Sequence, residues 1–247
     1  MWPSAAVNET GEKMTGLTSK IKRELLRLGA DIVGFGDLAE LPEDVRAGLP
    51  VGISVAAVYP GEVIRGIAEL PTLEYSEWYS RLNERLDEIV ARGAGMLREM
   101  GCRAIAQTRE HVGSGESQDH TTLPHKTVAT RAGMGWIGKS ALLVTEKYGS
   151  AIRLSSILTD APLDTVPPVN QSRCGDCPAC TEACPAGAVS GKPWAAGLDR
   201  DEFFDPVKCR RTARERARLG FGGDITICGK CIEVCPHTQK YINDCLS

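Results

Sequence analysis

Helix-spaced and strand-like apolar patterns alternate through the first 160 residues. Four leucine or isoleucine residues recur every three or four positions over 17–28 and predict a helix that ends at Gly29. A longer helix is predicted from Trp78 to Leu97, and a short one over Pro124–Ala132. Strand-like runs stand at 31–35, 53–59, 103–107, 140–145 and 152–158. This mixture predicts an α/β domain over residues 1–160.

The segments between these runs also carry predictions. The last two strand-like runs are joined by Glu146–Gly149, which predicts a hairpin. Residues 109–122 predict a polar loop. Residues 161–170 contain three prolines and no periodicity, so they predict a linker, and a second domain over 171–247 follows it.

Composition excludes several classes of protein. The chain of 247 residues has a formal net charge of −3, so no global field attracts nucleic acid or an anionic membrane. The sequence contains no run of about 18 apolar residues and no apolar N-terminal segment typical of a signal peptide. We therefore expect a cytoplasmic protein without a membrane partner.

Seven of the ten cysteines stand in two tight runs, which indicates metal binding in a cytoplasmic chain. The first run, Cys174-x2-Cys177-x2-Cys180-x3-Cys184-Pro185, has the spacing of bacterial ferredoxins. In those proteins three thiolates bind one 4Fe–4S cluster and the fourth binds its neighbour. Paired C-x2-C units also occur in zinc ribbons, which is the alternative. The triple spacing and the proline after each run favour iron.

The second run lacks one ligand, because Ile225 stands where a ferredoxin has its first cysteine. Cys209, between the runs, is the predicted substitute. Cys102 and Cys245 are outside the pattern and are assigned no role. The prediction is one cluster on Cys174, Cys177, Cys180 and Cys235, and another on Cys184, Cys209, Cys228 and Cys231.

The segment Gly133–Ser140 satisfies two phosphate-binding patterns, G-x-G-x-x-G and G-x4-G-K-S. Both patterns require a strand before the glycines and a helix after them. Here the predicted order is reversed, so nucleotide binding is disfavoured. A glycine turn that lets the backbone approach a large planar ligand, or that packs closely, is the better interpretation.

Two polar segments have open interpretations. His111, Asp119, His120 and His125 lie in or near the loop over 109–122, where they are either acid–base groups or solvated residues. The basic stretch over 208–218 is either a solvated helix face or a docking site for an acidic electron donor or nucleic acid. The remaining histidine, at position 237, is expected to pack beside a cluster.

Several of these segments together resemble epoxyqueuosine reductase, a family related to the reductive dehalogenases. They are Leu123–Lys126, Arg131–Lys139, Ile157–Asp160 and the double cysteine run with Cys209 between. The resemblance implies an α+β chain in which a nitroreductase-like α/β domain precedes a small ferredoxin-like domain with two 4Fe–4S clusters. It also implies base-off cobalamin, whose cobalt the clusters reduce. The positions placed near the corrin are Gly133, Gly135, Trp136, Ile137, Gly138, Lys139, Ser150, Ile152 and Leu154.

One departure from the family affects the proton donor. The family has a catalytic aspartate shortly after the strand matching 103–107, where this chain has Thr108-Arg109 and then a loop to Thr122. Asp119 or His120 is therefore the expected catalytic residue.

The sequence thus predicts an iron–sulfur oxidoreductase. Electrons from a flavodoxin or ferredoxin would pass through two clusters to cobalamin and reduce a small molecule or a corrinoid partner. One alternative is tRNA epoxyqueuosine reductase, ranked lower because many family members continue after the second run into a region that helps bind tRNA. The other is a non-catalytic ferredoxin-type electron carrier.

Overall fold

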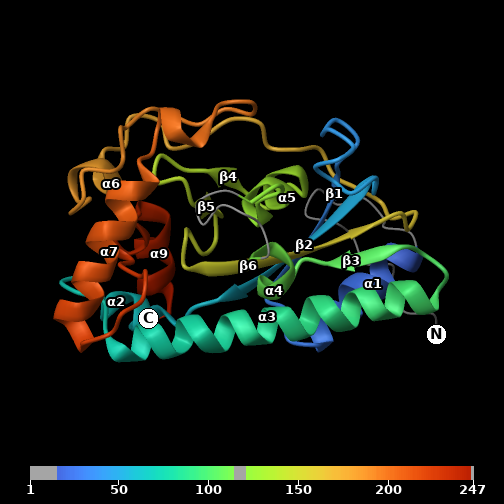
Figure 1. Cartoon of the computed structure of the whole chain (residues 1–247), viewed down its shortest axis with the longest axis horizontal. Helices are drawn as coiled ribbons and strands as arrows, with labels where there is room; N and C mark the ends of the chain where they lie inside the picture. The colour runs from blue at the N-terminus through green and yellow to red at the C-terminus, as the bar shows by residue number, and fades with distance from the viewer. Residues whose placement is uncertain (1–15, 114–120, 246–247) are drawn as a thin grey trace. The chain divides into compact units, whose positions relative to one another are not determined.

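The computed structural model describes residues 16–113 and 121–245 (Figure 1). The helices are α1 Gly16–Arg27, α2 Gly61–Arg65, α3 Leu73–Glu99, α4 Arg109–Gly113, α5 His125–Arg131, α6 Ala179–Glu182, α7 Pro206–Phe221, α8 Lys230–Glu233 and α9 Pro236–Asp244, with a 3-10 turn at Arg200–Glu202. The strands are β1 Ile32–Asp37, β2 Val51–Val58, β3 Ala104–Ala106, β4 Trp136–Ile137, β5 Leu143–Val144 and β6 Ile152–Thr159. The predicted mixture of helices and strands is confirmed.

The chain divides into two compact units, and each is discontinuous in sequence. The described part of unit 1 consists of residues 16–57, 84–113, 121–134 and 154–168; that of unit 2 consists of 58–83, 135–153 and 169–245. The sequence suggested consecutive domains, and that division stays a prediction. Most of the proposed linker belongs to unit 1, where Ala161 is fully buried and the Val166 N–H donates to the Phe35 carbonyl at 3.2 Å.

A four-stranded sheet in the order β1-β2-β6-β3 forms the centre of unit 1. β1 runs antiparallel to β2, with Ile32 opposite Ala56, and β3 runs antiparallel to β6, with Ala104 opposite Thr159. Seven of the eight residues of β2 are buried. A strand covered on both faces has no need of polar alternation, which explains its continuous apolar sequence.

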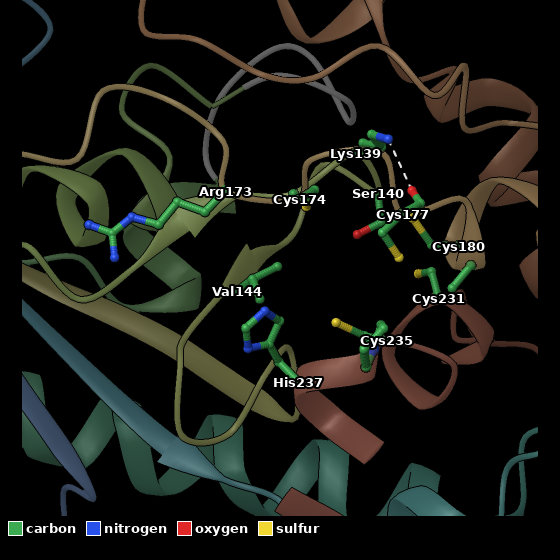
Figure 2. A pocket seen from close by; sticks show the side chains of 13 residues that line it. Lys139, Ser140, Val144, Arg173, Cys174, Cys177, Cys180, Cys231, Cys235 and His237 are labelled. Atoms are coloured by element: carbon green, nitrogen blue, oxygen red, sulfur yellow. Dashed lines mark hydrogen bonds between the residues drawn. The ribbon is translucent and has the colours of Figure 1, made fainter. Parts of the chain in front are cut away.

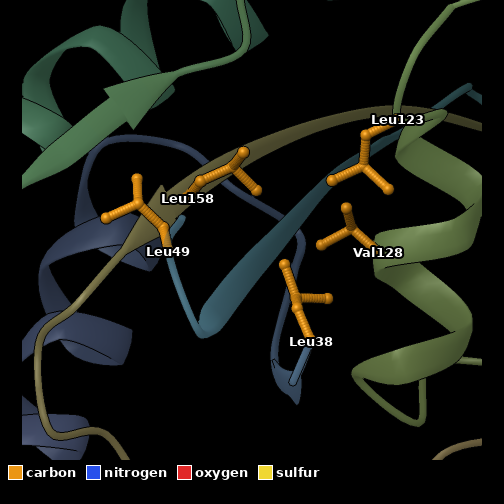
Figure 3. Close-up of a cluster of buried hydrophobic side chains, with 5 residues drawn as sticks. All are labelled: Leu38, Leu49, Leu123, Val128 and Leu158. Carbon is orange, nitrogen blue, oxygen red and sulfur yellow. The ribbon is translucent and has the colours of Figure 1, made fainter. Parts of the chain in front are cut away.

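Glycines in β1 and β2 allow α5 to approach one face of this sheet. A Cβ at Gly36 would lie 2.6 Å from the Ala132 nitrogen, and one at Gly52 would lie 2.6 Å from Val128 Cγ1. Since real Cβ atoms do not come so close, larger residues would displace the helix. α5 contributes to the cluster of buried side chains in Figure 3: Leu38, Leu49, Leu123, Val128 and Leu158.

The part of α3 that belongs to unit 1 packs within that unit through its predicted apolar side. Leu86, Ile89 and Val90 are at most 1% exposed, in agreement with the helical spacing in the sequence. A Cβ at Gly93 would lie 2.7 Å from both Leu25 in α1 and Ile157 in β6. The helix therefore contacts α1 and the sheet closely at this point.

Unit 2 has short elements and a small core of its own. β4 pairs with β5 in an antiparallel ribbon, with Trp136 opposite Val144. The core cluster of this unit consists of Ile137, Ala141, Trp194 and Phe203. Its helices pack in pairs, α2 with α9 and α6 with α8.

Two local predictions were wrong. Residues 140–145 and 152–158 do not form a hairpin, because β5 pairs with β4 and β6 lies between β2 and β3 in the main sheet. The intervening turn closes only through the Thr145–Gly149 bridge. The loop predicted over 109–122 begins as helix α4, in which the Arg109 N–H donates to Asp87 at 3.0 Å.

Candidate functional site

A cavity of about 140 Å³ within unit 2 is lined by cysteines from both runs (Figure 2). Cys177 and Cys180 come from the segment that leads into and forms α6, and Cys235 is the N-cap of α9. Figure 2 shows the sulfur atoms of Cys177 and Cys235 directed into the space between these segments. Pockets for drug-sized organic ligands measure about 300–1,000 Å³, so this cavity suits an inorganic cluster better than an organic cofactor. Its lining includes Cys174, Cys177, Cys180, Cys231, Cys235 and His237.

The thiols predicted to bind the first cluster lie close to one another. Burial raises the pKa of the Cys180 thiol to about 11, and the charges of Cys174, Cys235 and Cys177 raise it further. We call Cys174, Cys177, Cys180 and Cys235 the first group. A thiol with so high a pKa is protonated at neutral pH, so binding iron must release its proton.

The thiols predicted to bind the second cluster also lie together. Burial raises the pKa of Cys209 to about 11, with further contributions from Cys228, Cys184 and the Asp205 carboxylate. Burial also raises the pKa of Cys231 well above the usual value, and its neighbours include Cys209 and Cys228 as well as Cys180. We call Cys184, Cys209, Cys228 and Cys231 the second group. Cys231 lines the cavity of the first group too, so the two groups are adjacent.

A capped helix places Cys209. The Asp205 side chain accepts a hydrogen bond from the Lys208 N–H at 2.9 Å, and Pro206 occupies the first turn of α7. Both residues favour helix initiation at this point. Cys209 is thus fixed in the first helical turn, which turns it toward Cys184 and Cys228.

The glycine turn over 135–139 contacts the first group, and its residues Gly138 and Lys139 line the cavity. The Trp136 indole N–H donates to Cys174 Sγ at 3.4 Å, and Lys139 Nζ donates to the Cys177 carbonyl at 3.0 Å. A Cβ at Gly138 would stand 3.5 Å from Cys174 Sγ. A helix precedes the turn and a short strand lies within it, as predicted, so it lacks the strand–loop–helix order of a phosphate loop.

The nine positions placed near a corrin have different surroundings in the structure. Gly133 belongs to unit 1, and a Cβ there would lie 2.8 Å from Val166; Gly135 belongs to unit 2 and packs against the Val144 carbonyl. Ser150 is buried, and its N–H donates to Thr238 Oγ1 at 3.0 Å. Close packing explains both glycines, and the corrin contact stays a prediction. The other positions are Trp136, Ile137 and Ile152, which are buried, Gly138 and Lys139, which line the cavity, and Leu154, which is half-buried.

The predicted catalytic pair, Asp119 and His120, lies outside the described residues. His237 does pack beside the cysteines, as expected, with its ring 5.1 Å from that of Trp136. The sequence did not predict Trp136 as a hydrogen-bond donor to a cysteine, because nothing in the spacing relates positions 136 and 174. In the part of the chain that the structure describes, no helix is long and apolar enough to span a membrane.

A family model for a 4Fe–4S double cluster binding domain matches residues 173–238. All eight predicted cysteine ligands fall in this stretch. Residues 173–238 are therefore a domain of the type that binds two 4Fe–4S clusters.

Curated relatives carry the name that the sequence suggested. The epoxyqueuosine reductase of Synechococcus sp. (strain CC9605) is 35% identical over 145 residues, which is 58% of this chain and 44% of that protein. The epoxyqueuosine reductase of Escherichia coli (strain K12) is 31% identical over 118 residues, 48% of this chain and 31% of that protein. The chain thus spans less than half the length of these relatives.

Solved structures show the same fold. A catabolic reductive dehalogenase in complex with 3-bromo-4-hydroxybenzoic acid matches 95% of this chain and 34% of its own, with a TM-score of 0.67 and 21% identity. An epoxyqueuosine reductase with an epoxyqueuosine-modified tRNA stem loop matches 90% of this chain and 65% of its own, with a TM-score of 0.57 and 19% identity. The resemblance to both kinds of protein is confirmed.

Proposed function

We propose that the protein is an iron–sulfur reductase that accepts electrons singly and reduces epoxyqueuosine in tRNA. The observation that carries the proposal is the assembly of eight cysteines into two adjacent groups within the stretch that matches a double-cluster domain. Two adjacent 4Fe–4S clusters would pass single electrons between them. The names of the curated relatives support the substrate. The sequence ranked a small molecule or corrinoid partner above tRNA, and the relatives favour the opposite order.

Cobalamin is proposed as the second cofactor. Support comes from the sequence resemblance and from a structural neighbour described as acting in B12-dependent dehalogenation. The cavity of the first group is too small for a corrin, so a corrin would need a separate site beside the turn that holds Gly138 and Lys139. When bound, it would supply the low-potential reducing chemistry that thiolate clusters and protein side chains cannot provide. The nitroreductase-like character of unit 1 belongs to the same proposal.

The chain's own residues have defined parts in this scheme. The two cysteine groups would hold the clusters, and the buried residues Trp136 and Lys139 contact the first group. Asp119 or His120 would supply the proton that the product requires. The donor would be a flavodoxin or ferredoxin, and the reaction would take place in the cytoplasm, where thiols stay reduced.

Anaerobic purification after expression with added cobalamin tests the proposal. We expect about eight irons and eight sulfides per chain, and one cobalt. The reduced protein should convert an epoxyqueuosine-containing tRNA stem loop, with product detected by mass spectrometry of the nucleosides. Eight irons without cobalt or conversion would favour the electron-carrier alternative, and zinc in place of iron would refute the proposal.

A separate assay tests the proton donor. Substituting Asp119→Asn and His120→Gln together should reduce turnover at least about 100-fold, because general acid catalysis contributes typically that much. Iron content should not change. His125, whose Nδ1 lies 2.9 Å from Ser156 Oγ in unit 1, is the comparison site. If H125Q abolishes turnover and the double variant does not, the proton donor is wrongly assigned.

A further inference from the structure

The indole of Trp136 is held so that its N–H meets a cysteine of the first group. The side chain is only 1% exposed, and Nε1 lies 3.4 Å from Cys174 Sγ. The Arg173 guanidinium stands 5.6 Å from the centre of the indole, and the His237 ring packs against it edge-on at 5.1 Å. Because neighbours fix the ring on two sides, its N–H is kept pointing at the sulfur.

Lys139 places a positive charge beside the same group. Lys139 is 7% exposed, lines the cavity and donates from Nζ to the Cys177 carbonyl at 3.0 Å. Salt screens a buried charge much less than an exposed one. The ammonium therefore acts on this group under all ordinary ionic conditions.

The second group has different surroundings. It also has an N–H···S contact, from the Ala188 backbone to Cys184 at 3.4 Å. The Asp205 carboxylate acts on Cys209, but it is itself paired with Lys208 at 3.4 Å. Lys230, next to Cys231 in sequence, has its charge balanced by Glu233 at 2.8 Å. Hydrogen bonding to sulfur is thus similar in the two groups, whereas the two lysines beside the second group are each balanced by a carboxylate.

We propose that Trp136 and Lys139 raise the reduction potential of the cluster held by the first group above that of the cluster held by the second. One-electron reduction by a low-potential ferredoxin- or flavodoxin-type protein adds one negative charge to the cluster and its thiolates, while the donor loses one electron. An N–H donated to a ligating sulfur and a nearby ammonium stabilise that added charge. Electrons from a donor would then collect on the first cluster.

This inference rests on the proposed function, because it requires both clusters. Redox titration of the purified protein, monitored by electron paramagnetic resonance, tests it. We expect two midpoint potentials in the unaltered protein. In W136F the higher one should fall, with a threefold to tenfold smaller equilibrium constant for reduction, where tenfold corresponds to 59 mV. K139M should lower the same potential, and K139R should restore it, while the lower potential keeps its value.

Trp194→Phe is the matched control. Trp194 is another buried tryptophan of unit 2, and it packs in the core cluster with Ile137 and Phe203. W194F loses the same indole N–H without a cysteine partner, so both potentials should stay unchanged. Equal shifts in W136F and W194F, no shift in W136F and K139M, or one shared potential for both clusters would overturn the inference.

If W136F fails to assemble clusters, the unaltered protein still gives an answer. Protein with ¹⁵N-labelled tryptophan should show hyperfine coupling of one indole nitrogen to the reduced cluster in pulsed electron paramagnetic resonance. Absence of that coupling would overturn the part played by Trp136. A chain without iron would refute the proposed function, whereas eight irons with unaltered potentials would refute only this inference.

Discussion

The two cysteine groups are built from different elements. In the first group, three thiols come from one short stretch before and within α6, and the fourth is the N-cap of α9. In the second group, Cys209 comes from inside the 16-residue helix α7. The first group is enclosed by the turn that carries Trp136 and Lys139. The second is bordered by α7 with its acidic N-cap, Asp205, and by α8. Two clusters of the same kind would thus have different charged and polar residues around them.

The largest effect that distinguishes the groups should follow from Cys209→Ser. It removes a ligand that belongs only to the second group, so we expect iron to fall from about eight to about four per chain. The higher of the two midpoint potentials should survive. Iron and sulfide analysis with paramagnetic resonance of the reduced protein measures both quantities.

Cys102→Ser is the control for this substitution. Cys102 belongs to unit 1 and to neither group, so the variant should keep about eight irons. If C209S also kept eight irons, another residue would complete the second cluster, and the comparison between the groups would lose its basis.

A second substitution should weaken the first group through α9. Gly149 has φ +55°, and a Cβ there would lie 2.7 Å from Thr238 Cα in the first turn of α9, just after Cys235. Gly149→Ala combines backbone strain with this overlap, so we expect a loss of about 3 kcal/mol or more in the free energy of unfolding. Urea unfolding, followed by helix content and by cluster absorbance, measures it.

Gly187→Ala separates strain from overlap. Gly187 has φ +56°, follows Cys184 of the second group, and a Cβ there would meet nothing within 4 Å. Only backbone strain applies here, so G187A should lower the free energy of unfolding by about 1–2 kcal/mol. Equal losses in the two variants would show that α9 does not need the close approach of Gly149.

Seven of the eight proposed ligands could be predicted from local spacing, because the cysteines that wrap a cubane stand three or four positions apart in such runs. Cys209 followed from counting ligands and from its place between the two runs, which Cys102 and Cys245 do not share. The contact between Trp136 and Cys174 could not be predicted, because it joins residues 38 positions apart through tertiary folding. The predicted hairpin was wrong for a similar reason: β6 has the strand pattern, but its partners are fixed by burial in the main sheet.

A smaller effect concerns alkaline stability on the side of the second group. Tyr75 lies beside the second cysteine run, where a Cβ at Gly229 would stand 3.2 Å from Tyr75 Cζ, and its ring is 5.3 Å from that of Tyr59. Burial raises the pKa of Tyr59 to about 12, although the charge of Arg153 lowers it. Tyr59 ionises near pH 10 in the unfolded chain and near pH 12 in the folded protein. The free energy of unfolding is therefore unaffected below pH 10 and falls between pH 10 and pH 12. The loss from Tyr59 is about 2–3 kcal/mol.

Tyr59→Phe should remove the share of the alkaline loss that Tyr59 causes, while the share of Tyr75, whose pKa burial also raises, should remain. At pH 8 it should cost little, because the buried Tyr59 hydroxyl makes no hydrogen bond of normal geometry among the residues that the structure describes, although Tyr75 is a polar neighbour. Urea unfolding at pH 8 and pH 11 measures the difference. Tyr148→Phe, elsewhere in unit 2, is the control and should keep the alkaline loss of the unaltered protein. A strong loss of stability at pH 8 in Y59F would show that the hydroxyl has a partner after all.

The smallest effect should come from the exposed side of α7, for which docking of an acidic electron donor is one of the open interpretations. Several of the basic residues predicted for docking have local partners instead: Arg218 pairs with Asp224 at 2.8 Å, and Arg214 donates to Thr226 at 3.2 Å. Exposed Arg211 is the better test. Arg211→Glu should raise the KM for reduced flavodoxin about threefold at low salt and leave kcat unchanged. The effect should vanish near 0.5 M salt, since exposed charges are screened.

The same charge reversal at Arg27, in α1 of unit 1, should leave the KM unchanged. A rise in R211E alone would place electron entry beside Cys209, at the cluster for which we propose the lower potential. Electrons would then move from the cluster of the second group to that of the first, because electron transfer toward the higher reduction potential is favourable. An equal KM in R211E and the unaltered protein would instead leave α7 as a solvated helix whose part is to hold Cys209.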